Sequence, residues 1–279
     1  MECDEYSRGD KGERPATSVT GTREQGSTTK IVLVHARFYA PDAHRTGQVV
    51  TLPADEAAHA TRVMRLKPGD QVRVFDGAGH EFLAVIDRAT KTNVDVRLEE
   101  PHPAAPERRI RVALAQAVLK GDKMDDVVRD AVMMGVTSII PLLATRSEVS
   151  AATLQRRRSR ERWERIAIVS AKQCGRAVVP AIEEPCDLDA LVARGVSDGQ
   201  ATTLMFVEPA AAGGARSEFT AAPLDSATLI IGPEGGWTSE EIDKTASAVS
   251  HLTLAGPTLR ADAMALVALS MLFTKLGEF

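Results

Sequence analysis

Residues 229–242 read Leu-Ile-Ile-Gly-Pro-Glu-Gly-Gly-Trp-Thr-Ser-Glu-Glu-Ile, and this stretch decides the fold. It starts as an apolar run, passes through a turn with three glycines and a proline, and continues into a helix. Thr238 or Ser239 is suited to cap that helix, and Glu240 and Glu241 fall in its first turn, where the helix dipole favours negative charge. Glycines let the backbone approach a ligand closely, but an ordinary strand-to-helix turn also uses them. Both interpretations stay open on this stretch alone.

Length and composition are those of a globular protein. The 279 residues suffice for one large or two ordinary domains, and 44% of them are apolar. No apolar run reaches the roughly 18 residues of a membrane helix. The net charge of −4 is not that of a general nucleic-acid binder, so RNA contacts would depend on local basic patches. Three cysteines without Cys-x-x-Cys spacing indicate neither disulfides nor a metal site, and they fit a reducing cytoplasm.

The chain divides into segments of different composition. Residues 1–30 have almost nothing to bury and are predicted to be a disordered extension. Residues 36–100 have short alternating patterns and one helical stretch at 54–66, which favours a small β-barrel. Pro-rich residues 101–108 are a linker, and residues 109–279 alternate strands and helices, as in an α/β domain with a mostly parallel sheet.

Within the α/β segment, apolar runs and helical spacing place the elements. Helices are expected at 122–135, 159–173 and 261–276, with a short strand around Val178 and a loop at 209–223. The buried strands are expected at 110–119, 136–143, 204–207, 228–231 and 252–254.

An arginine cluster lies at the start of the second of these helices. Its members are Arg156, Arg157, Arg158, Arg160, Arg162 and Arg165. Guanidinium groups suit phosphate binding, although a charge run is more often a solvated helix face. We favour phosphate binding here because so many arginines exceed what a solvated face needs.

A second loop narrows the interpretation. Residues 254–260 read Leu-Ala-Gly-Pro-Thr-Leu-Arg and run straight into an apolar helix. No dinucleotide-binding glycine motif, phosphate-binding loop or nucleophile elbow is present, and the histidines have no metal spacing. The chemistry therefore falls to two strand-end loops, 232–237 and 254–260.

These two loops together resemble the knotted (SPOUT) methyltransferase superfamily, and within it the ribosomal RNA methyltransferases that act on uridine N3. The resemblance is carried by Ile230–Gly236 and Leu254–Arg260. Further matches are Leu119–Met124, Gln173–Arg176, Arg37-Phe38-Tyr39 and Arg62–Arg65. Together they cover about residues 36–277.

The resemblance implies an α/β fold with a trefoil-knotted C-terminal domain and an N-terminal PUA-like barrel that binds RNA. It also implies a cytoplasmic homodimer that uses S-adenosylmethionine and no metal. The expected reaction is methylation of N3 of a uridine in 16S ribosomal RNA of the assembled small subunit.

The resemblance also assigns roles to residues. Arg260 is the expected catalytic residue, in contact with the target base or favouring its deprotonated form. The cofactor-binding residues are Phe206, Val207, Glu208, Ile231, Gly232, Pro233, Glu234, Gly235, Gly236, Leu254, Gly256, Leu259 and Arg260. The RNA-binding residues are Arg37, Arg62, Arg65, Arg156, Arg157 and Arg158.

The chain departs from the family pattern beside Arg260. The family commonly has Thr-Glu-Thr after this arginine, whereas this chain has Ala261-Asp262-Ala263, in which Asp262 can replace the acid. Two alternatives stay open: a knotted enzyme that methylates a ribose 2′-hydroxyl, and an RNA-binding relative without catalysis.

Overall fold

The N-terminal part of the structure is a small curled β-sheet. The computed structural model describes residues 36–198, 202–209, 224–254 and 256–279. The first sheet has the order β1-β3-β4-β5-β2, with a parallel β1–β3 pair and antiparallel pairs elsewhere. Its strands are β1 (Arg37–Tyr39), β2 (Val49–Thr51), β3 (Gln71–Phe75), β4 (Glu81–Ala89) and β5 (Val94–Pro101). Alternate side chains of these strands form a separate apolar core.

The single helix expected at 54–66 has two parts and ends early. α1 (Ala54–Ala58) continues into a π-helical turn, η1 (His59–Val63). The wider turn arises because the Met64 N–H donates to the carbonyl of His59 at 3.1 Å. Arg65 then takes a left-handed conformation, with φ 56°, and Leu66 packs against the barrel core. The helical segment therefore ends before Arg65.

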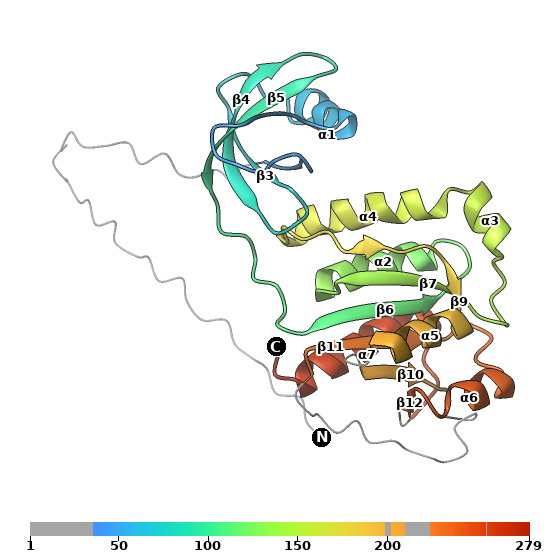
Figure 1. The fold of residues 1–279 in the computed structure, drawn as a ribbon. Helices are drawn as coiled ribbons and strands as arrows, with labels where there is room; N and C mark the ends of the chain where they lie inside the picture. Colours follow the sequence, from blue (N-terminus) through green and yellow to red (C-terminus); the bar gives the residue numbers. More distant parts are fainter. Residues whose placement is uncertain (1–35, 199–201, 210–223, 255) are drawn as a thin grey trace, which may run out of the picture. The chain divides into compact units, whose positions relative to one another are not determined.

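The C-terminal part is a parallel sheet (Figure 1). The order is β12-β10-β11-β6-β7-β8, and β9 also pairs with β7. All described pairs in this sheet are parallel. The strands are β6 (Arg111–Ala117), β7 (Ser138–Leu143), β8 (Ala181–Ile182), β9 (Cys186–Asp187), β10 (Thr202–Phe206), β11 (Ser226–Ile231) and β12 (Ser250–Leu252). Parallel strands bring their carboxyl ends to one edge, where α/β proteins bind ligands.

Helices cover both faces of this sheet. Along β11, Leu229 and Ile231 join the core formed with α2, α4 and α7, whereas Ile230 joins the core formed with α5 and α6. The helices are α2 (Lys123–Met134), α3 (Ala151–Arg156), α4 (Ser159–Cys174), α5 (Leu188–Asp198), α6 (Ser239–Thr245) and α7 (Ala261–Lys275). Burial on both faces explains why these strands read as continuous apolar runs. None of the described helices is long and apolar enough to cross a membrane.

Several expectations differ from the structure or fall outside it. The strand expected around Val178 lies at β8 instead, and Val178 forms only isolated bridges with the barrel turn at residues 77 and 78. Two helices, α3 and α5, had not been expected. The predicted extension at 1–30 and most of the loop at 209–223 lie outside the described residues.

The expected domain limits and the knot stay predictions. Strand order and register alone do not define how the chain is threaded.

Candidate functional site

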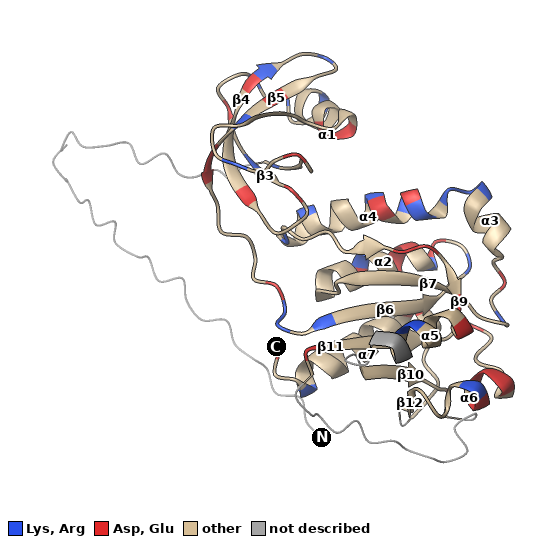
Figure 2. Cartoon of the chain, in the orientation of Figure 1, with Lys and Arg blue, Asp and Glu red and all other residues tan. Residues whose placement is uncertain are grey.

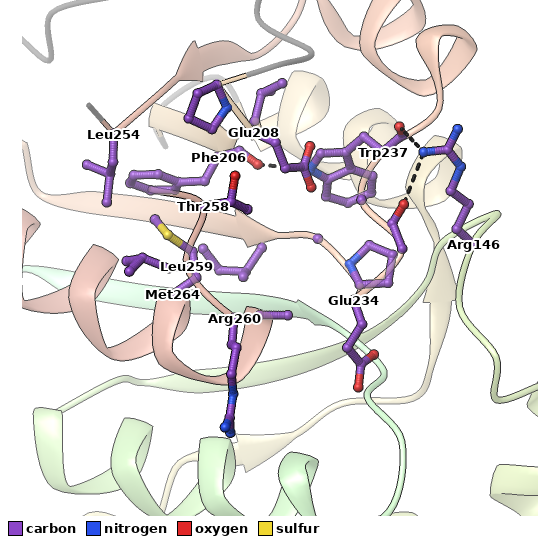
Figure 3. A pocket seen from close by; sticks show the side chains of 18 of the residues that line it. Arg146, Phe206, Glu208, Glu234, Trp237, Leu254, Thr258, Leu259, Arg260 and Met264 are labelled. Atoms are coloured by element: carbon purple, nitrogen blue, oxygen red, sulfur yellow. Dashed lines mark hydrogen bonds between the residues drawn. The ribbon is translucent and has the colours of Figure 1, made fainter. Parts of the chain in front are cut away.

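A pocket of about 700 Å³ lies at the carboxyl edge of the parallel sheet. Its walls come from the segments that follow β10, β11 and β12 and from the start of α7 (Figure 3). Because β10 lies between β11 and β12, these loops are neighbours in space although they are far apart in the sequence. Lys123 and Arg146, which follow β6 and β7, complete the lining.

The structure brings the expected cofactor residues together around this pocket. All of them line it except Gly256, which lies in the same loop as Leu254 with φ 111°. The pocket also has lining residues that sequence reasoning did not assign to it. Trp237, Pro257 and Thr258 belong to the two loops that were predicted to carry the chemistry, whereas Lys123, Arg146, Pro209, Ala261 and Met264 lie outside those loops.

Close packing within the site explains why two positions of the loop, 232 and 236, are glycine. A Cβ on Gly232 would lie 2.9 Å from Nε1 of Trp237. That indole is buried, and its Nε1 donates a hydrogen bond to the carbonyl of Phe206 at 2.8 Å. Gly236 has φ 68°, and a Cβ there would lie 2.8 Å from Oε1 of Glu208. The glycines therefore make room for Trp237 and Glu208, a reason that differs from the expected access for a ligand.

Arg146 packs against Gly235, the third glycine of the loop. Its Nη1 donates to the carbonyls of Gly235 and Trp237, both at 3.0 Å (Figure 3). A Cβ on Gly235 would lie 3.1 Å from the Cβ of Arg146. The sequence offered one indication that Arg146 belongs to the site, because it lies three residues after a parallel strand, where α/β proteins bind ligands.

The helix after the loop begins as the sequence predicted. Thr238 caps α6, and a capping box joins its side chain to that of Glu241. Glu241 also accepts from the backbone N–H of Thr145 at 2.8 Å. Burial raises the pKa of Glu241, but the hydrogen bonds from Thr145 and Thr238 outweigh it and hold the pKa below its usual value. The Glu241 carboxylate therefore connects the start of α6 to Thr145, in the segment that follows β7.

Glu234 connects the same loop to the segment before α2. Its Oε1 accepts from Nζ of Lys123 at 3.0 Å and from the backbone N–H of Lys120 at 3.3 Å. Burial raises the pKa of Glu234, yet these contacts prevail and lower it overall. Glu208, in contrast, has no ion-pair partner among the described residues.

Arg260 lines the pocket, and its side chain is highly exposed. It is the N-cap residue of α7, and its side chain is 74% exposed. Its Nε donates to Oδ1 of Asp262 at 3.1 Å, and Nη2 pairs with Oδ2 of the same carboxylate. The hydrogen bond from Arg260 lowers the pKa of Asp262. Figure 3 shows the Arg260 side chain extending away from the other labelled residues of the pocket.

The lining has the mixed chemistry that a nucleoside attached to a charged amino acid requires. One part is apolar, with Phe206, Ile231, Leu254, Leu259 and Met264. The other part offers backbone groups of the glycine-rich loop and the Glu208 carboxylate. A pocket of this volume and mixed polarity is typical of small-molecule sites. The residues present therefore fit S-adenosylmethionine.

Arg37 is buried and its guanidinium is fully occupied. The residue is 7% exposed. It forms two hydrogen bonds with the Glu81 carboxylate, at 3.0 and 2.9 Å. It also donates to the carbonyls of Ala171 at 2.8 Å and Arg176 at 2.7 Å, at the end of α4. This burial argues against the expected RNA contact by Arg37 and indicates a structural role.

The other expected RNA-binding arginines lie on the surface. Arg62 and Arg65 are exposed near η1, and Arg156, Arg157 and Arg158 are exposed between α3 and α4. Figure 2 shows basic and acidic positions alternating along α4.

Ion pairs account for part of the arginine cluster. Arg158 pairs with Glu161, and Arg162 pairs with Asp122 and Asp125. Arg157 forms no ion pair with any residue that the structure describes. A solvated, ion-paired face therefore accounts for some of the cluster but not for all of it.

Comparisons with known proteins match both parts of the chain. A model of the RNA methyltransferase domain matches residues 106–273, and a model of the RNA methyltransferase PUA domain matches residues 52–99. Ribosomal RNA small subunit methyltransferase E of Bacillus subtilis is 29% identical, over 79% of this chain and 88% of the relative. The Rickettsia conorii protein of the same name is 28% identical, over 84% of this chain and 93% of the relative.

Solved structures agree with these matches. A Legionella pneumophila protein, described as a methyltransferase and solved with its cofactor SAM, superposes with a TM-score of 0.79 at 30% identity. That match covers 87% of this chain and 98% of the other. The Neisseria gonorrhoeae ribosomal RNA small subunit methyltransferase E, bound to S-adenosyl methionine, has a TM-score of 0.76 at 26% identity and covers 86% and 97%. The chain therefore belongs to the RNA methyltransferase family that includes ribosomal RNA small subunit methyltransferase E.

Proposed function

We propose that this chain transfers a methyl group from S-adenosylmethionine to N3 of a uridine in 16S ribosomal RNA, within the small ribosomal subunit of the cytoplasm. One observation carries the proposal: loops after three neighbouring parallel strands form a single pocket of about 700 Å³, and Arg260 is among its lining residues. The family match supports the reaction class, and the names of the relatives support the RNA.

In this proposal the two halves of the pocket have different tasks. When bound, S-adenosylmethionine supplies a methyl group on a sulfonium sulfur, which a nucleophile can accept by in-line displacement. Leu254, Leu259 and Ile231 hold the adenine by apolar contact and exclude water from it. Backbone groups of Gly235 and Gly236 bind the polar parts, and Glu208 offers a negative charge near the positive donor.

Arg260 acts on the target base. Uridine N3 carries a proton and reacts as a nucleophile only after that proton has passed to solvent water, so a nearby cation favours the reactive form. The N3–methyl bond then forms as the sulfur–methyl bond breaks, and S-adenosylhomocysteine leaves. The Arg260 guanidinium is exposed and held by the Asp262 carboxylate, which restricts its orientation. Because N3 is buried in a base pair in duplex RNA, the target uridine must be unpaired or flipped out.

The exposed arginines supply the RNA contacts. Arg62 and Arg65 on the barrel and Arg156, Arg157 and Arg158 after α3 offer guanidinium groups to phosphates. Arg37 is left out of this set because it is buried.

The proposal includes a homodimer, which the surface of α7 supports. This helix is apolar on nearly every side, and Leu266 and Val267 are 39% and 37% exposed. Helices that are hydrophobic all round are normally buried. Light scattering is expected to report a dimer for the wild type and a smaller species for Leu266→Glu.

The test uses small subunits from a strain that lacks the modification. Purified protein and donor with a labelled methyl group are incubated with these subunits, and the RNA is digested to nucleosides for mass spectrometry. The proposal expects label in N3-methyluridine at one nucleotide. Label in a ribose-methylated nucleoside would contradict it, as would no incorporation despite donor binding by calorimetry.

A matched pair of variants separates chemistry from general charge effects. Arg260→Gln removes the exposed arginine of the pocket lining, and kcat is expected to fall about 100-fold or more, in line with the loss of one group that stabilises developing charge. Arg129→Gln removes an exposed arginine that pairs with Asp126 on α2, and it should leave kcat unchanged. Equal effects of the two substitutions would argue against a catalytic role for Arg260.

A further inference from the structure

A second pocket, of about 610 Å³, lies on the barrel and takes no part in the donor site. It lies between the segment that follows η1 and the turn that joins β4 to β5. Its lining residues are Thr61, Arg62, Leu66, Lys67, Pro68, Ala89, Thr90 and Lys91.

The cations of this pocket lack counterions. Arg62, Lys67 and Lys91 are exposed, and none forms an ion pair with any described carboxylate. The nearby Asp70 carboxylate accepts instead from the backbone N–H of Lys67, at 2.7 Å. Other basic residues of the same barrel do pair: Arg88 with Asp95 at 2.9 Å and Arg97 with Asp87 at 3.1 Å. Arg62, Lys67 and Lys91 thus bring three cations without a described carboxylate partner into one pocket, whereas Arg45 and Arg65, which also lack such a partner, lie outside its lining.

The backbone beside the pocket is unusual. η1 is a π-helical turn, and Arg65 has φ 56° although it is not glycine. π-turns and left-handed non-glycine residues are uncommon, require support from their surroundings, and cluster at functional sites. Here Leu66 supplies that support by packing against the barrel core. Arg62 and Lys67, which lie before and after Arg65 in the sequence, line the same pocket.

We propose that this pocket binds the sugar-phosphate backbone of the RNA substrate through Arg62, Lys67 and Lys91. The inference rests on the proposed function, which makes RNA the substrate. The hydroxyls of Thr61 and Thr90 already donate to carbonyls, so the hydrogen-bond donors left for a phosphate are those of the three cations. Because the overall charge of the chain is −4, such a local basic site is needed to hold a polyanion.

The apolar part of the surface favours a nucleic-acid backbone over free phosphate. Leu66, Pro68 and Ala89 line the pocket, and Val63 and Met64 beside it are 69% and 44% exposed. Inorganic phosphate would leave this apolar surface unused, whereas the ribose and base next to a phosphate can cover it.

The test is equilibrium binding of a fluorescein-labelled single-stranded RNA, followed by anisotropy at several salt concentrations. The full-length variant Arg62→Gln/Lys67→Gln/Lys91→Gln is compared with Arg45→Gln/Arg88→Gln/Arg97→Gln, which removes the same charge elsewhere on the barrel. Each phosphate contact contributes about 0.7 to the slope of log K against log salt for single strands. The pocket variant should therefore lose about 2 units of slope and, at 0.1 M salt, on the order of 100-fold in affinity.

Further measurements distinguish binding of the RNA backbone from binding of free phosphate and from failure of the proposed methyl transfer. Lys67→Arg/Lys91→Arg should keep the wild-type slope because it keeps the charges, and donor binding by calorimetry should be the same in all variants. Equal RNA affinity and slope in the pocket variant and its control would overturn the proposal. Loss of inorganic phosphate binding with unchanged RNA binding would overturn it too, by identifying a free-phosphate site. RNA binding is measured without methyl transfer, so failure of the proposed reaction would be seen separately in the wild type.

Discussion

Substitution of Arg37 distinguishes a structural arginine from one that binds RNA. Its guanidinium forms two hydrogen bonds with Glu81, whose side chain is 1% exposed. Arg37→Met would leave that carboxylate buried, with only Arg73 at 3.4 Å to compensate it. It would also remove the donors to the carbonyl of Arg176 and to that of Ala171, which would keep its hydrogen bond from the Gly175 N–H.

The expected destabilisation follows from this geometry. Removal of one partner of a buried ion pair lowers the free energy of unfolding by about 3 to 5 kcal/mol, because the other charge stays buried without compensation. Replacement of both partners is far milder, so Arg37→Met/Glu81→Leu should recover most of the loss. Urea denaturation followed by circular dichroism measures both values, with the change read from the midpoint at constant slope.

RNA binding by the same variants decides between the two roles. We expect Arg37→Met to keep its RNA affinity and salt slope at temperatures where it stays folded, because the wild-type guanidinium is not accessible to phosphate. A loss of stability below about 1 kcal/mol, together with a salt slope lowered by about 0.7, would refute the reasoning and restore Arg37 as an RNA contact.

Three further substitutions test the donor pocket and its supports. Glu208→Gln should reduce the preference for S-adenosylmethionine over the neutral product S-adenosylhomocysteine by about tenfold in calorimetric titrations, because it removes an unpaired negative charge; an unchanged preference would exclude a charge effect. Gly232→Ala should weaken donor binding while the protein stays folded, because its Cβ would displace the Trp237 indole; wild-type affinity would contradict this. Glu241→Gln should lose about 1 kcal/mol at pH 7. Since the folded state lowers the pKa of Glu241, the wild-type advantage should decline as pH falls through that pKa, and a difference that does not decline with falling pH would count against the cap.

Sequence patterns predicted the parallel sheet well because burial on both faces leaves a strong signal. The runs around Leu114, Ile140 and Ile230 contain few polar residues, and each became a central strand. β8 has two residues and therefore no periodicity to detect, which explains why its strand was expected near Val178. α5 was missed because Gly195 and several charged residues interrupt its apolar pattern.

The candidate site was predicted as a set of loops but not as a set of contacts. Gly232, Gly235 and Gly236 indicated an open backbone, whereas the structure fills the space beside them with Trp237, Arg146 and a carboxylate. Arg146 is 89 residues from Gly235 in the sequence, so no local pattern could have joined them. Long-range packing of this kind follows from strand order, which the sequence alone did not define.

The departure beside Arg260 shows how a family pattern and a structure complement each other. The pattern expected from the family resemblance has Thr-Glu-Thr after this arginine, whereas this chain has Ala261-Asp262-Ala263. The carboxylate at position 262 binds the guanidinium through two hydrogen bonds, so the shorter acid preserves an arginine–carboxylate pair. Ala261 is buried at the edge of the pocket, where a hydroxyl would need a hydrogen-bond partner. The departure therefore removes two hydroxyl groups and keeps the charged pair on which the proposed chemistry depends.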